Sequence, residues 1–289
     1  MTFLSRMILT GTALAVLPIP SLMAADYDPP IFVEEAPEYV PVEVGSGWYL
    51  RGDIGYAVTT SAKGPFNYRT FDALTATYGA STFATSSIDT GFTFGGGIGY
   101  RFNEWIRADA TIEGFQGKFE GTTTSALPCL DPVANPAYVG TTCRSEDEAR
   151  YNGMSIMANA YVDLGTFAGF TPYAGAGAGY TYLRWGGLNN DTYCVDGGGA
   201  CPPPQAYIST VTHPGEQSWR FTYAFMAGVA YDVTDVLKLD VGYRYRHIDG
   251  GDMFRFDPAS VTAGATGIQG TESGFDQHEV KVGIRYEIW

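Results

Sequence analysis

The sequence is constrained most by a strict alternation of apolar and polar residues that recurs along the chain. In the last such segment Val280, Val282 and Ile284 alternate with Lys281 and Arg285. Successive side chains of a β-strand point to opposite faces, so this segment predicts a strand with one apolar and one polar face. The same period-two pattern predicts eight strands, at residues 48–57, 92–102, 105–115, 153–164, 172–184, 219–233, 237–247 and about 277–289.

The connections between these segments alternate between short and long. Residues 103–104, 165–171 and 234–236 are short connections, whereas 58–91, 116–152, 185–218 and 248–276 are long. Each strand is near the roughly 9–11 residues that a tilted strand needs to cross a bilayer. The pattern predicts an all-β fold, an eight-stranded antiparallel transmembrane β-barrel with four long extracellular loops and short periplasmic turns. Periodicity alone leaves open a soluble barrel that has its apolar faces inside. Residues 71–79 are predicted to form a helical turn over the barrel mouth.

The N-terminus divides into two segments ahead of the barrel. Residues 1–25 are predicted to be a signal peptide for export through the Sec pathway, because Arg6 precedes an apolar stretch over 7–17 and the small residues Ala24 and Ala25 follow. Residues 26–46 are Pro-rich and acidic, which predicts an extended periplasmic leader that acts as a spacer or as a docking peptide. Residues 47–289 form the predicted barrel, which places the protein in the outer membrane. The net charge of -14 argues against nucleic acid as a partner.

All four cysteines fall in the predicted long connections. An exported chain meets an oxidising compartment, so an even number of cysteines predicts disulfides. Three pairings are possible, and the two local pairs Cys129–Cys143 and Cys194–Cys201 are favoured. A zinc site of four thiolates is the alternative, although no Cys-x-x-Cys spacing supports it. We expect no cofactor and no metal.

Several of the predicted strands resemble a known group of membrane proteins. The stretches GWYLRGDIGY at 47–56, GGGIGYRF at 95–102, TPYAGAGAGY at 171–180 and VGYRY at 241–245 are similar to strands of small alphaproteobacterial outer-membrane proteins. These belong to the opacity-protein and OmpA-transmembrane-domain-like porin group. The resemblance implies an eight-stranded barrel with variable surface loops and no catalytic motif. It also implies that Trp289 is the C-terminal aromatic signal read by the barrel-assembly machinery. Trp289 lies on the opposite face from Tyr286, so either Ile288 closes the lipid-facing stripe or a bulge restores the register.

The polar faces of the strands carry charges of both signs. The interior of an eight-stranded barrel is just wide enough for side chains to fill, and charges buried there must be paired. We therefore predict an interior ion-pair network, with pairs such as Asp240–Lys281 or Arg244–Glu279. Its expected members are Arg51, Asp53, Arg101, Arg107, Asp109, Glu113, Asp163, Asp232, Lys238, Asp240, Arg244, Arg246, Glu279, Lys281 and Arg285.

Three functions remain open at this level. The favoured one is a structural, non-enzymatic barrel that contributes to outer-membrane integrity and presents its loops for contact or adhesion. A narrow porin is the alternative, because glycine columns on the second and fifth strands could leave a water path. An outer-membrane lipid-modifying enzyme is the third, based on polar residues at strand ends: His247, His278, Asp249, Asp252, Asp276 and Ser273.

Both histidines are expected to point outward, where contact with lipid headgroups is the simplest role. The expected partners are outer-membrane lipids including lipopolysaccharide, the barrel-assembly machinery, and a host or surface ligand of the loops.

Overall fold

The computed structural model describes residues 47–60, 66–125, 129, 142–195 and 206–288. The predicted signal peptide, the predicted leader and the expected assembly signal Trp289 lie outside the described residues. Within them no helix is long and apolar enough to span a bilayer.

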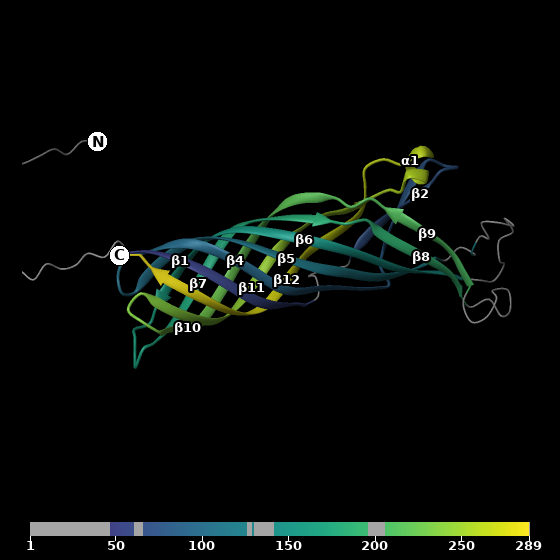
Figure 1. Ribbon diagram of the computed structural model, residues 1–289. Helices are drawn as coiled ribbons and strands as arrows, with labels where there is room; N and C mark the ends of the chain where they lie inside the picture. The colour runs from purple at the N-terminus through teal and green to yellow at the C-terminus, as the bar shows by residue number, and fades with distance from the viewer. Residues whose placement is uncertain (1–46, 61–65, 126–128, 130–141, 196–205, 289) are drawn as a thin grey trace, which may run out of the picture. The chain divides into compact units, whose positions relative to one another are not determined.

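Eight antiparallel strands form a closed ring, which confirms the predicted barrel (Figure 1). Neighbouring strands pair in chain order, and the first pairs with the last in a continuous register from Tyr49–Glu287 to Thr60–Asp276. No bulge therefore interrupts this register near the described part of the C-terminus. The barrel strands are β1 (Trp48–Thr60), β4 (Thr85–Arg101), β5 (Ile106–Ser125), β6 (Thr142–Asp163), β7 (Phe170–Trp185), β10 (Gln217–Asp232), β11 (Leu237–Arg255) and β12 (Ile268–Glu287).

Side-chain oxygens stabilise two of the short turns by accepting hydrogen bonds from backbone N–H groups two or three residues later in the chain. Asn103 Oδ1 accepts hydrogen bonds of 2.8 Å from the backbone N–H groups of Trp105 and Ile106. Thr234 Oγ1 accepts one of 3.0 Å from the N–H of Leu237. Such local acceptors satisfy backbone donors that the strand ladder leaves unpaired, and they allow the chain to reverse direction within a few residues.

Several strands extend well beyond their predicted ends, and β6 shows why. It is 22 residues long and alternates between exposed and buried side chains almost throughout. Its outward face is polar at first and then becomes apolar: Arg144, Glu146, Glu148, Arg150 and Asn152 precede Met154, Ile156, Ala158, Ala160 and Val162. Apolar alternation, which the sequence prediction followed, begins only at residue 153. The first half of β6 therefore projects beyond the band of apolar residues that faces outward on the barrel strands, which we call the apolar belt.

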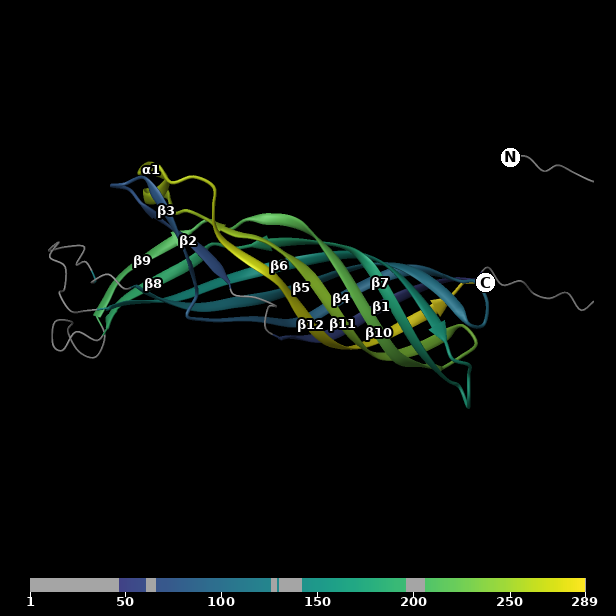
Figure 2. The ribbon, with the colours of Figure 1, turned by 180° about the vertical axis from the view of Figure 1, so that it is seen from behind.

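The long connections contain further structure at one end of the barrel (Figures 1 and 2). The hairpin β2 (Asn67–Asp72) and β3 (Thr77–Thr82) belongs to the first connection, β8 (Leu188–Val195) and β9 (Ala206–His213) to the third, and helix α1 (Pro258–Thr262) to the fourth. Strand β8 pairs with β6, so the sheet continues into this hairpin.

The predicted helical turn at 71–79 is wrong, because β2 and β3 pair there and enclose a tight turn. In this turn Asp72 Oδ1 accepts hydrogen bonds from Leu74 and Thr75, and Ala76 has a positive φ of 53°.

The outer surface of the barrel is apolar, and its charges are inside. Exposed apolar residues cover the strands, among them Leu50, Ile54, Phe94, Ile98, Ile112, Ile156, Phe225, Val241, Val282 and Ile284. Arg107, Arg244 and Arg285 are buried in the lumen. A soluble barrel would have the reverse arrangement, since charge in hydrocarbon and bare apolar surface in water are both costly. This belt is therefore the lipid-facing surface.

A charge on this belt is expected to destabilise the protein. Val241 is 47% exposed and lies between Val229 of β10 and Val282 of β12. We expect Val241→Arg to lower the free energy of unfolding by about 2–4 kcal/mol, because the guanidinium would enter hydrocarbon. Urea unfolding from lipid vesicles measures this change. Val261→Arg, at an exposed position of α1, is the control and should have little effect. Equal stability of the two variants would contradict the assignment of the belt.

Candidate functional site in the barrel lumen and the extracellular cup

Glu113 of β5 is the centre of an ion-pair cluster inside the barrel. Its side chain is 4% exposed and contacts three cations from β11 and β12. Arg246 Nη1 lies 2.7 Å from Glu113 Oε1, Lys281 Nζ lies 3.1 Å from Oε2, and Arg244 also pairs with Oε1. Strand β5 is not a neighbour of β11 or β12 in the ring, so these contacts cross the lumen.

A second cluster contains Arg51, which joins two carboxylates. Its Nη2 lies 2.7 Å from Asp53 Oδ1, and its Nη1 lies 2.7 Å from Asp109 Oδ2. Asn159 Nδ2 donates a 2.8 Å hydrogen bond to Asp109 Oδ1. Tyr161 Oη accepts a 2.9 Å hydrogen bond from Arg51. The carboxylates and guanidinium are thus paired with one another and with neutral polar groups, as buried charges require.

Every residue of the predicted network makes at least one ion pair in the structure. The remaining pairs are Arg107–Asp163 at 3.0 Å, Lys238–Asp232 at 2.5 Å, Arg285–Asp240 at 3.6 Å, Arg101–Glu287 and Arg244–Glu279.

The expected pair Asp240–Lys281 is wrong. In the register of β11 and β12, Arg244 lies opposite Glu279, but Asp240 lies opposite Gly283 and Lys281 opposite Gly242. Asp240 therefore pairs diagonally with Arg285, and Lys281 reaches across the lumen to Glu113.

A layer of aromatic and aliphatic side chains fills the lumen beyond these ion pairs. Its members are Phe66, Ile88, Phe115, Phe119, Ala149, Tyr151, Leu183, Trp185, Leu188, Ile248, Met253, Phe254 and Phe275, with Phe83 packed against them. We call this layer the aromatic plug. The strand pattern predicted a polar interior throughout and did not indicate this layer. The available signal was the inward parity of Phe115 and Phe119 on β5, which continues past the predicted strand end.

A cavity of about 280 Å³ opens at the end of the barrel that carries the long loops. We call it the extracellular cup. All four long connections line it, with Tyr68, Thr70, Phe83, Thr123, Asp147, Leu188, Asn190, Val211, His213, Phe254, Asp257, Gln269 and Gly270. The sequence predicted that the loops carry specificity but did not indicate these residues as a group. They come from segments far apart in the chain, which only the closed barrel brings together.

Two carboxylates of the cup are held by neighbouring donors. Asp147 accepts hydrogen bonds from Ser145 Oγ at 2.7 Å and Asn190 Nδ2 at 2.5 Å, and burial raises its pKa. Asp257 caps helix α1 and accepts from the N–H groups of Ala259 and Ser260 at 2.9 and 3.1 Å. Although burial raises the pKa of Asp257, the hydrogen bonds from Ser260 and Ala259 outweigh this effect and lower it.

His213 is the titratable base of the cup, and it is 8% exposed. Burial lowers the pKa of its imidazole, against the opposing effects of the Asp257 carboxylate and the Gln269 side chain. His213 Nδ1 and Gln269 Oε1 are both buried atoms.

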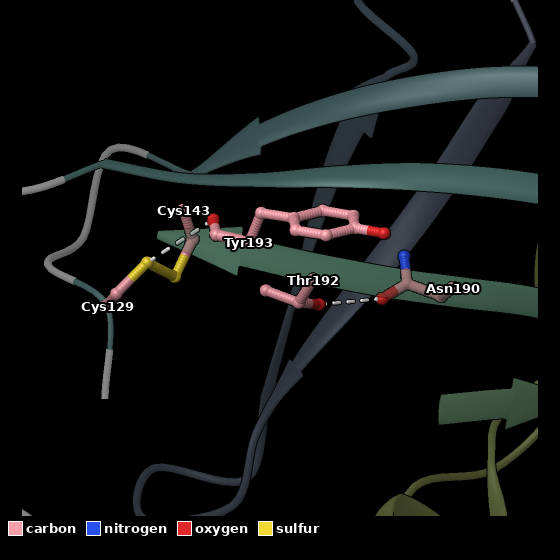
Figure 3. The surroundings of a disulfide bond; sticks show 5 residues. All are labelled: Cys129, Cys143, Asn190, Thr192 and Tyr193. Carbon is pink, nitrogen blue, oxygen red and sulfur yellow. Dashed lines mark hydrogen bonds between the residues drawn. A yellow bond between two sulfur atoms is a disulfide. The ribbon is translucent and has the colours of Figure 1, made fainter. Parts of the chain in front are cut away.

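A disulfide closes part of the second long connection. Cys129 and Cys143 form a disulfide, which Figure 3 shows beside Tyr193. Cys194 lies opposite Cys143 in the register of β6 and β8. It also forms a disulfide, but with a different cysteine. Cys201 lies outside the described residues, so the bond Cys194–Cys201 stays a prediction. The alternative of a zinc site with four thiolates is wrong, since the sulfurs of Cys129 and Cys143 are bonded to each other.

The predicted histidine cluster forms outside the lumen. His247 Nδ1 lies 2.6 Å from Asp276 Oδ1, and its Nε2 lies 3.3 Å from Asp249 Oδ1. His278 bonds to the hydroxyl of Tyr243, an exposed residue of the outer surface.

Ser273 makes no hydrogen bond with either histidine within the described residues, and the Asp252 backbone carbonyl accepts from Arg220. A Ser–His–Asp relay is therefore not assembled among these side chains. The part of the chain that the structure describes also holds no cluster of three or more metal-binding side chains.

The comparisons with known proteins agree with this architecture. The model of the family described as "Outer membrane protein beta-barrel domain" matches residues 14–287. An "Uncharacterized protein" of Brucella suis biovar 1 (strain 1330) is 34% identical, over 96% of this chain and 99% of the relative. A "Putative adhesin" of Rickettsia felis is 26% identical, over 86% of this chain and 90% of the relative.

Among solved structures, Neisserial surface protein A has a TM-score of 0.42 and 17% identity, covering 85% of this chain and 100% of that one. The family match spans nearly the whole chain, and the Brucella relative matches over nearly its full length. This chain therefore belongs to the outer membrane protein β-barrel family.

Proposed function

We propose that this protein is a non-conducting outer-membrane barrel that contributes to membrane integrity and presents its loops for contact or adhesion. The filled lumen carries the proposal. The ion pairs around Glu113 cross the barrel, and the aromatic plug lies beyond them. A cavity between these ionic side chains, lined by Arg51, Asp53, Tyr161 and Lys281 among others, measures only about 20 Å³. Such a volume holds about one water molecule.

The long strands that project beyond the membrane support the proposal that the loops are presented for contact or adhesion. Strands β5 and β6 continue their pairing as far as Ser125 and Cys143, far beyond the apolar belt, and β8 adds to the same sheet. A rigid sheet that projects from the membrane holds loops in fixed positions, which favours specific binding over a flexible surface. The name of the Rickettsia relative is compatible with such a role.

Conductance in planar bilayers tests the proposal against the narrow porin. We expect the purified protein to insert without reproducible unitary current steps, because paired charges and packed rings leave no continuous water path. A general porin reconstituted in the same bilayers controls for insertion and detection. Defined, reproducible steps from this protein would overturn the proposal.

Two further measurements address integrity and the lipid-modifying alternative. A strain that lacks the protein is expected to become more sensitive to detergent, with complementation by the intact gene as the control. Its lipopolysaccharide acyl chains, compared by mass spectrometry, should be unchanged. An altered acyl pattern that His247→Ala or His278→Ala reproduces would instead favour an enzyme.

A further inference from the structure

We propose that one sector of the barrel wall, on β6 and β7, binds the phosphorylated headgroup of lipid A, the glycolipid of the outer leaflet. This inference deepens the proposed function, since it names a lipid through which the barrel would contribute to membrane integrity. The site consists of Arg150 of β6 and Arg184 of β7, together with a neighbouring cavity that Arg184 and Arg255 line. We call it the arginine site.

The arginine site lies at the extracellular edge of the apolar belt. Met154, Tyr182 and Trp219 lie opposite one another on β6, β7 and β10, and the rings of Tyr182 and Trp219 are 5.2 Å apart. Such aromatic side chains mark the level at which hydrocarbon gives way to headgroups. Arg184 follows Tyr182 by two residues on the same face of β7, which places it about 7 Å farther along the strand. Its side chain is therefore at the level of the headgroups.

Arg150 and Arg184 are diagonal neighbours in the pairing of β6 with β7. Asn152 lies opposite Arg184, and Arg150 is the next residue outward from Asn152 on the same face of β6. Diagonal neighbours are within reach of each other when their side chains are long. Both arginines are exposed, and neither makes an ion pair within the described residues. The two guanidinium groups can therefore share one phosphate, because each presents a planar, permanently charged set of donors.

A cavity of about 390 Å³ adjoins Arg184. It forms where the chain leaves β7 at Gly186 and approaches β10 at Gly215, and these two segments are so close that a β-carbon at Gly215 would collide with the backbone. Arg255 of β11 also lines the cavity. Its Nε pairs with Glu216, yet the Arg255 side chain is 63% exposed. The cavity volume falls within the roughly 300–1,000 Å³ of small-molecule sites, so it can accept a phosphate group with part of the sugar that carries it.

The position of the arginine site favours a lipid over a soluble anion. Tyr180 and Phe221 are exposed on the belt directly below it, with their rings 5.9 Å apart. The acyl chains of a lipid can extend along these apolar side chains while the phosphate contacts Arg184. A soluble anion lacks this second contact and would gain only the ionic one.

The charges of the neighbouring sectors confine the site to β6 and β7. Lys118 of β5 lies opposite Arg150, but Glu120 and Glu148 already hold its Nζ at 2.6 and 3.3 Å. On β11 and β12 the carboxylates of Asp249 and Asp276 lie at the outer surface. A phosphate would be repelled there, whereas the arginine site offers unpaired positive charge.

Native mass spectrometry tests the inference with the full chain in detergent that is free of lipid. We expect lipid A with two phosphates to bind at least tenfold more tightly than the same lipid without phosphates. Arg150→Gln and Arg184→Gln are each expected to weaken this binding roughly tenfold, because each removes charge-assisted hydrogen bonds. Arg144→Gln is the matched control. Arg144 is exposed on the same face of β6 but about 20 Å farther from the belt than Arg150, so this variant should bind normally.

Three outcomes would overturn the inference. These are equal binding of the two lipids, binding that neither arginine variant weakens, and binding of inorganic phosphate as tight as that of lipid A, which would indicate a site for free anions. A heat-modifiability gel verifies that each variant is folded. Arg184→Lys, which retains the charge, should bind lipid A more tightly than Arg184→Gln does.

The lipid assignment and the proposed function fail by different observations. Unitary current steps, or unchanged detergent sensitivity of a strain that lacks the protein, would refute the proposed function whatever the purified protein binds. A silent barrel that binds no lipid A refutes only the lipid assignment.

Discussion

Replacement of Glu113 by glutamine is expected to lower the free energy of unfolding by about 3–5 kcal/mol. The carboxylate is buried and pairs with Arg244, Arg246 and Lys281, which come from strands on the other side of the lumen. Glutamine keeps the shape of the side chain but removes its charge, so three cations lose a shared partner. Because Arg244 retains Glu279, most of the cost should come from Arg246 and Lys281. Urea unfolding in lipid vesicles measures the change.

Glu120→Gln is the matched control for this experiment. Glu120 is on the same strand and also contacts a lysine, Lys118 at 2.6 Å, but both side chains are largely exposed. Exposed ion pairs contribute little because water and salt screen them. We therefore expect Glu120→Gln to behave like the unaltered protein. If Glu113→Gln had the same free energy of unfolding as the unaltered protein, the pairing of Arg244, Arg246 and Lys281 with Glu113 would not contribute to stability.

Truncation of Phe119 to alanine is expected to destabilise the protein by a similar amount, about 3–5 kcal/mol. The ring is 0% exposed in the centre of the aromatic plug. Its centroid lies 4.8 Å from that of Phe66, 5.3 Å from that of Phe83 and 6.2 Å from that of Trp185. Alanine would leave a cavity that the surrounding strands cannot close, since the ring of hydrogen-bonded strands fixes their spacing. Urea unfolding in lipid vesicles measures the change.

Phe167→Ala provides the corresponding control. Phe167 is 85% exposed in the short turn between β6 and β7, so its loss removes little packing. Unchanged stability of this variant together with a large loss for Phe119→Ala would locate the effect in the plug. If Phe119→Ala unfolded like the unaltered protein, the rings would not form a packed layer.

The apolar and polar faces of each strand could be predicted from the sequence, because side-chain direction in a strand alternates with a period of two. Ile112 and Glu113 illustrate this: adjacent in sequence, one lies on the outer surface and the other in the lumen. The strand order could be predicted as well, since the alternation of short and long connections is that of a membrane barrel in which consecutive strands are neighbours. The ends of β5 and β6 could not be predicted, because beyond the membrane the outward face of both strands becomes polar, while the inward face of β5 carries the aromatic residues Phe115 and Phe119.

The sequence by itself therefore determined the number of barrel strands and which side chains share a face of each strand. Only the tertiary structure decided that Glu113 is shared by Arg244, Arg246 and Lys281, and that His213 and Gln269 meet in one cup. The physical reason is the range of each effect. Alternation is a local property of the backbone, whereas contacts across the lumen depend on the closure and register of the whole ring.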